Sequence, residues 1–127
     1  MIHKSITAAT SDDRGQIADI LYKSTFQHAA IIESKGGGII RGNHYHKHTT
    51  QWNYVLSGRI KLLSQDPGGP VVETLMQPGD FAATGPNVRH ALVGVDEASV
   101  LVFTKGPRGG KEYESDTFRL EQPLQAA

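Results

Sequence analysis

Residues 38–58 read GIIRGNHYHKHTTQWNYVLSG, and this stretch decides how the rest of the chain is interpreted. It contains His44, His46 and His48, three of the six histidines in the protein. Histidine is a common metal ligand and titrates near neutral pH. Side chains on a β-strand repeat every two residues, so His44 and His46 point to one face and can reach one ion together. His48 joins them only if the strand continues through the polar residues that follow His46.

The spacing around the first two histidines selects them over the second pair. Gly38 lies six positions before His44. Gln51 lies five positions after His46, and Gly58 lies seven positions after Gln51. This arrangement resembles the first motif of the cupin superfamily, G-x5-H-x-H-x3,4-E-x6-G, with Gln51 where the family usually has glutamate. The register that starts at His46 does not fit the motif.

Composition and charge set limits on the class of protein. The chain has 127 residues, which suits one domain with a single core. Thirteen Lys and Arg balance thirteen Asp and Glu, so neither a nucleic acid nor an anionic membrane is favoured as a partner. There is no cysteine, hence no disulfide framework and no thiolate chemistry. The polar N-terminus lacks a secretory apolar core and no apolar run approaches the roughly 18 residues of a membrane span, so we expect a soluble, cytoplasmic protein.

Short alternating segments separated by turns predict a chain made of strands. We expect strands at residues 16–22, 27–34, 39–46, 51–57, 59–64, 71–76, 81–84, 90–95 and 99–104. Ser57-Gly58 is the expected hairpin turn between two of them. Residues 1–13 are expected to form an irregular arm or a short edge strand, and residues 105–110 a flexible hinge before a charged tail. Residues 1–127 then form one domain with its core at about residues 15–105.

Many short strands with frequent turns indicate an all-β sandwich or barrel. The double-stranded β-helix, or jelly roll, is the natural choice, and it is also the fold that the cupin resemblance implies. From the pattern alone, another β-sandwich is the alternative. A small jelly roll leaves sheet edges open, so we also expect a homodimer with the N-terminal arm as the element exchanged.

His90 is the candidate third ligand. The second cupin motif runs G-x5-P-x-G-x2-H-x3-N, and here Gly79 stands at its start and His90 at its histidine. The residues between match loosely, with Gly85 at the proline position and Asn87 at the second glycine. The turn is still rich in Gly, Pro and Asn, which suits a tight corner that aims His90 inward. A lone histidine is more often a hydrogen-bonded core residue than a ligand, but the first motif favours the ligand role.

The resemblance implies a divalent transition metal held by His44, His46, Gln51 and His90. Three imidazoles suit zinc, nickel, iron, manganese or copper alike. A glutamate would cancel one charge of the ion, whereas the neutral amide of Gln51 cancels none. Such an ion polarises a carbonyl strongly and lowers the pKa of bound water. In the alternative interpretation, Gln51 only begins a strand and forms local hydrogen bonds.

A further resemblance points to a substrate. Residues 38–45, GIIRGNHY, resemble the G-x-x-R-G-x-H-Y segment of dTDP-4-dehydrorhamnose 3,5-epimerases and related sugar-nucleotide cupins. The DRG at residues 13–15 resembles the D-x-R-G near the start of the same proteins. The resemblance implies that His44 is the general base and that Arg41 and Tyr45 contribute to substrate binding, with Arg41 at the nucleotide phosphate.

Two features separate the chain from those epimerases. They are metal-free and usually carry glutamine at the position of His46, whereas the related 3,4-ketoisomerases have His-x-His there. A regular strand would also place Arg41 on the opposite face from His44. A bulge at Gly42 would re-aim the arginine, so we predict a bulge or bend at that glycine, with Arg41 turned toward the opening.

Three classes of function fit these observations. The first is an isomerase, epimerase or lyase that acts on a sugar-derived carbonyl compound or a sugar nucleotide, with or without metal. The second is a metal-dependent dioxygenase, which Gln51 disfavours. The third is a non-catalytic module that binds a sugar or another small molecule. Fold does not fix function, so the sequence does not separate the first class from the third.

Overall fold

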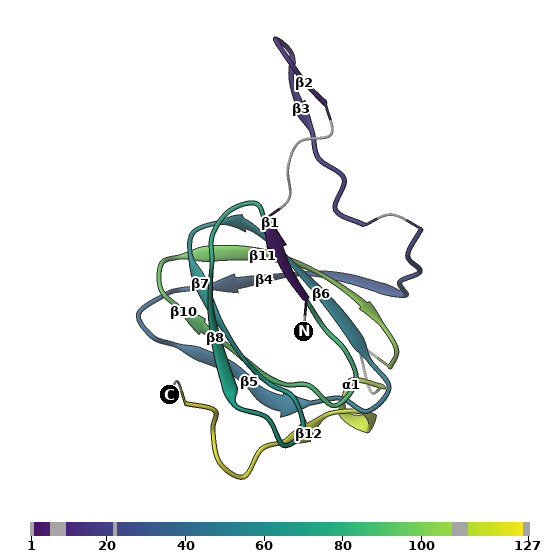
Figure 1. The fold of residues 1–127 in the computed structure, drawn as a ribbon, viewed down its shortest axis with the longest axis vertical. Coiled ribbons are helices and arrows are strands. Elements are labelled where there is room, and N and C mark those ends of the chain that lie inside the picture. Colours follow the sequence, from purple (N-terminus) through teal and green to yellow (C-terminus); the bar gives the residue numbers. More distant parts are fainter. Residues whose placement is uncertain (1, 6–9, 22, 108–111, 126–127) are drawn as a thin grey trace.

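The computed structural model describes residues 2–5, 10–21, 23–107 and 112–125, and the regular structure in this part of the chain is almost entirely β-strand (Figure 1). The first sheet has the order β1-β9-β6-β11-β4, with bounds Ile2–Ser5, Asp80–Thr84, Thr50–Ser57, Ala98–Lys105 and His28–Ser34. The second sheet has the order β12-β5-β10-β7-β8, with bounds Phe118–Arg119, Ile40–Tyr45, Arg89–Gly94, Ile60–Gln65 and Val71–Met76. Neighbouring strands are antiparallel throughout. The expected all-β jelly roll is confirmed.

Three further elements lie outside the paired sheets. β2 (Thr10–Asp12) and β3 (Gly15–Ile17) form a hairpin that projects away from the barrel in Figure 1, and α1 (Glu112–Ser115) is a single helical turn before β12. No helix in the described ranges is long and apolar enough to cross a membrane.

The core forms because β6 and β11 alternate between buried and partly exposed side chains, as strands of a two-layer structure do. Both sheets contribute to it: the main cluster consists of Val55, Ile60, Leu62, Met76, Ala82, Leu92, Val100 and Val102. Along β6, Val55 lies in this cluster while Gln51 lies nearer the start of the strand. One end of the interior is therefore apolar, and the other is left to polar side chains.

The eight strands expected from residue 27 onward are each found within one residue of their expected bounds. The strand expected at residues 16–22 is wrong. Of that stretch, only residues 16–17 belong to a strand, and residue 22 lies outside the described residues. The physical reason is that Ile17, 62% exposed, has no core to face, so its alternation with polar neighbours is not used for packing.

The expected hairpin at Ser57-Gly58 is also wrong. β6 belongs to the first sheet and β7 to the second, so this turn is a corner between the two layers. Gly58 has φ 70°, and a Cβ there would collide with the carbonyl oxygen of Glu97. The glycine is required by this close approach and not by a hairpin.

Both ends of the chain join the barrel. β1 pairs with β9 at the edge of the first sheet, which fits the edge strand expected at the N-terminus. β12 pairs with β5 at the edge of the second sheet, so the segment expected to be a charged tail is part of the fold. Residues 108–110 of the expected hinge lie outside the described residues.

Candidate active site

A bulge in β5 shapes the site, as predicted. His44 lies opposite His90, but the next paired residue of β5 is Gly42, so Asn43 is the extra residue. Gly42 and Asn43 have φ 100° and 57°, and a Cβ on Gly42 would lie 3.0 Å from the carbonyl oxygen of His90. The bulge changes the parity of the strand, and in consequence Arg41 and His44 line the same cavity.

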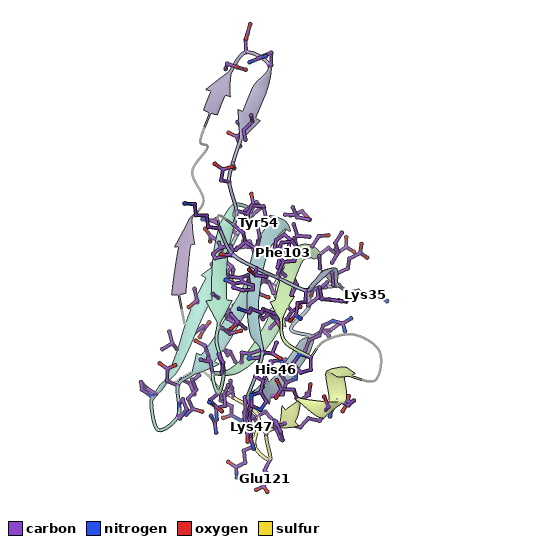
Figure 2. All side chains as sticks on the ribbon, turned by 90° about the vertical axis from the view of Figure 1, so that its right-hand side faces the viewer. Lys35, His46, Lys47, Tyr54, Phe103 and Glu121 are labelled. Carbon is purple, nitrogen blue, oxygen red and sulfur yellow. The ribbon has the colours of Figure 1, made fainter. Side chains whose placement is uncertain are left out.

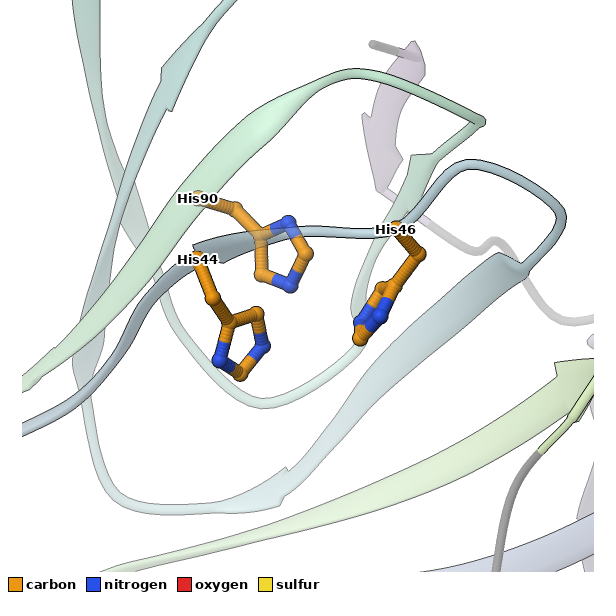
Figure 3. Close-up of side chains that lie close together, drawn as sticks. All are labelled: His44, His46 and His90. Atoms are coloured by element: carbon orange, nitrogen blue, oxygen red, sulfur yellow. The ribbon is translucent and has the colours of Figure 1, made fainter. Parts of the chain in front are cut away.

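Three histidines converge inside the barrel (Figure 3). His44 lies near the end of β5, His46 follows directly after that strand, and His90 comes from β10. Their ring centroids are 4.7–5.3 Å apart, and their ligand atoms lie within 4.8 Å of one another. His46 and His90 are buried and His44 is half-buried. The structure thus brings together the three histidines selected by the motif spacing.

Backbone carbonyl groups orient two of these rings. Nδ1 of His46 donates to the carbonyl oxygen of Asp116 at 2.8 Å, and Nδ1 of His90 donates to that of Val88 at 3.0 Å. With the proton on Nδ1, each neutral ring presents the lone pair of Nε2. This is the arrangement in which protein imidazoles usually bind metals.

Gln51 is oriented by a chain of amide hydrogen bonds. Nδ2 of Asn53 donates to the carbonyl oxygen of Ala82 at 3.2 Å, which defines the other amide atom of Asn53 as its acceptor oxygen. That oxygen accepts from Nε2 of Gln51 at 2.9 Å. Oε1 of Gln51 is then the amide atom available to the cavity, which Gln51 lines.

These side chains fit a divalent metal ion. Nitrogen ligands with bonds of about 2.1 Å stand roughly 3–3.5 Å apart around one ion, so only small rotations of the three rings are needed. The ion would be held by His44, His46 and His90, with Oε1 of Gln51 as a neutral oxygen ligand. Among the described residues these histidines form the one group of this kind with ligand atoms so close together.

The C-terminal segment is hydrogen-bonded to the loop that carries His46. The buried Asp116 carboxylate accepts from the amides of Lys47 and His48, at 3.0 and 2.9 Å, and from the Thr49 hydroxyl at 2.7 Å. Burial raises the pKa of the Asp116 carboxyl, but the hydrogen bonds from Thr49, His48 and Lys47 lower it by more, so this pKa lies below its ordinary value. Figure 2 shows His46 and Lys47 at the same end of the barrel as the C-terminal helix.

The cavity beside the histidines has a volume of about 420 Å³ and a cationic lining. Arg41 and Arg119 line it together with His44 and His90, and none of the lining residues that the structure describes carries a carboxylate. Glu114 pairs with Arg119 at 2.9 Å outside this lining, and the hydrogen bonds from Arg119 hold the pKa of the Glu114 carboxyl below its ordinary value. The lining favours an anionic ligand.

Arg41 also lines a second, larger cavity of about 900 Å³. Its other walls include Ile31, Lys35 and Glu97, and it contains none of the histidines. Arg41 is therefore a lining residue of both cavities. A ligand with two parts joined by an anionic linker matches this arrangement.

Two residues of the histidine stretch lie elsewhere. The Tyr45 ring stacks on Phe118 at 5.3 Å and lies under the Arg89 guanidinium at 4.2 Å, and Tyr45 does not line the cavity. Its role in substrate binding stays a prediction. His48 is exposed and is not part of the cluster.

The sequence reasoning missed Asp116 and Arg119. Both lie in the segment expected to be a tail. The sequence signal was the short alternation of residues 117–120, TFRL, which is typical of a strand but too brief to stand out.

A jelly roll of two antiparallel sheets with three inward-facing histidines is the arrangement that the cupin motifs predict. Residues 30–104, more than half of the chain, match the Cupin domain family, and the chain belongs to this family. A comparison with curated proteins finds no match.

Solved structures with the same fold include enzymes of sugar-nucleotide metabolism. A mutant of the 3,4-ketoisomerase QdtA from Thermoanaerobacterium thermosaccharolyticum, in complex with TDP-4-keto-6-deoxyglucose, is 19% identical with a TM-score of 0.72, over 94% of this chain and 86% of that chain. A 3,4-ketoisomerase from Helicobacter canadensis is 19% identical with a TM-score of 0.77, over 94% and 91%. A dTDP-4-dehydrorhamnose 3,5-epimerase from Sulfolobus tokodaii is 17% identical with a TM-score of 0.71, over 85% and 70%. At these identities the likeness shows the fold.

Proposed function

We propose that this cupin is an isomerase or epimerase of a keto sugar carried on a nucleoside diphosphate. The observation that carries the proposal is the position of Arg41, which lines both the cavity of His44 and the larger cavity beside it. A diphosphate at Arg41 would direct the sugar to the histidines and the nucleoside to the larger cavity. The binding of TDP-4-keto-6-deoxyglucose by QdtA, which shares the fold, supports this assignment.

In the proposed reaction His44 moves a proton next to the carbonyl group. As a neutral imidazole it takes the proton from the hydroxyl-bearing carbon beside the C=O, while the carbonyl oxygen gains a proton from water and an enediol forms. Return of the proton to the former carbonyl carbon, with loss of the proton from the other enediol hydroxyl group, moves the carbonyl group by one position. Delivery of a proton from water to the opposite face of the first carbon, with loss of the proton from the former carbonyl oxygen, inverts that centre. A metal ion held by the three histidines would supply a Lewis acid that polarises the carbonyl oxygen, but His44 would then be a ligand, so its role as base belongs to the metal-free protein.

The direct test is incubation of the purified protein with TDP-4-keto-6-deoxyglucose in D2O, followed by NMR. We expect a ketoisomerised or epimerised product and deuterium at a carbon next to the carbonyl. Absence of both product and exchange, with and without added divalent metal, would contradict the catalytic proposal. If the sugar nucleotide still bound, the chain would be a non-catalytic binding module. Consumption of O₂ during the reaction would instead indicate a dioxygenase.

The metal site gives a separate prediction. Alanine at His44, His46 or His90 should each remove most of the nickel or zinc that the wild-type protein takes up, because two remaining imidazoles hold an ion far less tightly than three. Gln51→Glu should retain the metal, since a carboxylate is the stronger ligand. His48→Ala is the matched control and should change nothing. The measurement is elemental analysis after loading and desalting, and a wild-type protein that takes up no metal would show the metal assignment to be wrong.

Arg41→Lys is expected to weaken TDP binding about tenfold, because lysine loses the bidentate contact with phosphate. Metal uptake should be unchanged. Arg59→Lys is the matched control, since Arg59 pairs with Asp96 on the surface and lines neither cavity. Isothermal titration with TDP measures both variants, and equal affinities of Arg41→Lys and the wild type would argue against a diphosphate at Arg41.

We also propose that the protein forms a homodimer through the outer face of the first sheet. Ile31 is 60% exposed and pairs with Leu101 of β11, and Leu101 pairs in turn with Tyr54 of β6. Phe103 lies two residues after Leu101 on β11, so it faces the same side of the sheet. Figure 2 shows Tyr54 and Phe103 on this sheet. An apolar sheet face of this kind is typical of an interface, and the projecting β2–β3 hairpin is the candidate for exchange.

Leu101→Glu should convert this dimer to a monomer in sedimentation experiments at micromolar concentration, because it places a charge in the centre of the interface and Leu101 lines neither cavity. Val72→Glu is the control, since Val72 is 48% exposed but lies on β8 in the second sheet. A monomeric wild-type protein would refute the proposed dimer.

A further inference from the structure

The extra residue of the bulge, Asn43, is hydrogen-bonded to the C-terminal segment through both of its oxygen atoms. Its backbone carbonyl oxygen accepts from the N–H of Leu120 at 2.9 Å, and its side-chain Oδ1 accepts from the N–H of Leu124 at 2.9 Å. A backbone N–H only donates, so the amide atom that faces Leu124 is the oxygen. Leu124 lies 81 residues from Asn43 in the sequence. The bulge in β5 is therefore bonded to a distant part of the chain.

The C-terminal segment is itself held by packing on the outer face of the second sheet. Leu124 is 8% exposed and forms an apolar cluster with Leu63 of β7 and Ala91 of β10, and Leu120 packs against this cluster. The residue before Leu63 and the residue after Ala91 both belong to the main core, so the cluster lies on the opposite face of the sheet. Figure 1 shows the segment after β12, in yellow, on the side of β5. The partners of Asn43 thus have a fixed position.

The bulge decides where Arg41 points. Asn43 has φ 57°, a left-handed conformation that is unfavourable for most residues with a Cβ. Without the extra residue β5 would be regular, and Arg41 would lie on the opposite face from His44. His44 is paired on both sides, with His90 and with β12, whereas only residues 40–42 of β5 precede the bulge. Loss of the bulge is therefore expected to turn Arg41 out of the cavity and to leave His44 in place.

We propose that Asn43 is a positioning residue for Arg41: by bonding the C-terminal segment to the bulge, it keeps the guanidinium in the cavity of His44. The inference rests on the proposed function, because Arg41 is the residue proposed to bind the diphosphate. Asparagine suits the position because it tolerates the left-handed conformation and its amide oxygen supplies the acceptor. Aspartate shares both properties, glycine shares only the conformation, and alanine has neither.

This series is tested by isothermal titration of full-length variants with TDP. We expect Asn43→Asp to bind within about twofold of the wild type, Asn43→Gly about threefold more weakly and Asn43→Ala about tenfold more weakly, because the apparent affinity falls with the fraction of molecules that keep the bulge. Nickel or zinc uptake should be unchanged, since His44 keeps its place. Gln65→Ala is the matched control: Gln65 also makes one side-chain hydrogen bond to a backbone group in the second sheet, to Gly69 at 2.9 Å, and lines neither cavity.

A double variant separates positioning from a general loss of stability. If Asn43 acts through Arg41, adding Asn43→Ala to Arg41→Lys should weaken TDP binding by only about twofold more, because the bidentate contact is already lost. A further tenfold loss in the double variant would mean that the two residues act independently, which overturns the proposal. If Asn43→Ala does not fold, Asn43→Gly replaces it in the same comparison, since glycine adopts the left-handed conformation without strain.

The remaining outcomes distinguish this inference from the proposed function. Equal TDP affinities of Asn43→Ala, Asn43→Gly and the wild type overturn the positioning role and leave the proposed function in place. An affinity of Asn43→Asp as low as that of Asn43→Ala shows that the acceptor oxygen is not what matters, which also contradicts the proposal. A wild-type protein that does not bind TDP overturns the proposed function together with this inference.

Discussion

Replacing His44 with alanine is expected to lower the rate of proton exchange next to the substrate carbonyl by about 10²–10⁴-fold, the usual contribution of a general base. His44 is half-buried, lines the cavity with Arg41, and reaches it from a strand end that the bulge at Gly42 has re-aimed. The TDP affinity should change little, since the proposed phosphate contact is made by Arg41. The measurement is deuterium incorporation from D2O, followed by NMR.

Metal loss needs to be separated from loss of the base, because His44 belongs to both proposals. The wild-type protein is therefore assayed after treatment with a chelator. If the chelated protein retains exchange and His44→Ala does not, His44 acts as the base. His48→Ala is the control, since His48 lies in the same stretch but outside the cluster. Full exchange activity in the His44→Ala variant would show that His44 is not the general base.

Replacing Asp116 with alanine is expected to have the largest effect on stability, lowering the free energy of unfolding by roughly 2–4 kcal/mol. The 2% exposed carboxylate accepts hydrogen bonds from the Lys47 and His48 amides and the Thr49 hydroxyl, and its removal leaves these donors without their partner. For a domain of this size the loss corresponds to a decrease in melting temperature of roughly 10 °C.

The same substitution should also weaken metal uptake, because the backbone of residue 116 orients the His46 ring. Asp116→Asn should have an intermediate effect, since it retains one acceptor oxygen but places an NH₂ group against a backbone amide. Glu121→Ala is the control, as Glu121 is exposed in the same segment. Differential scanning calorimetry checks the order of the three variants, and an unchanged melting temperature for Asp116→Ala would show that the C-terminal segment does not stabilise the histidine loop.

The sequence alone predicted the strands from residue 27 to residue 104, and the cupin resemblance implied the candidate ligands His44, His46, His90 and Gln51, of which the structure brings the three histidines together. Strand side chains alternate with a period of two, so local alternation predicts both the strands and the shared face of His44 and His46. It also predicted the bulge, because a glycine between Arg41 and His44 is the residue that tolerates a positive φ. These properties depend on a few adjacent residues, so they can be predicted from the local sequence pattern.

Only the tertiary structure decided which strands are neighbours and where the segments near the two ends of the chain pack. The turn at Ser57-Gly58 has the composition of a hairpin, but packing of the two layers makes it a corner. Asp116 is one aspartate in a charged segment until folding brings it to the loop of His46, 70 residues away. Asn43 likewise meets Leu124, 81 residues away, only because the C-terminal segment packs on the second sheet. Contacts of this kind depend on the path of the whole chain, and no local pattern records them.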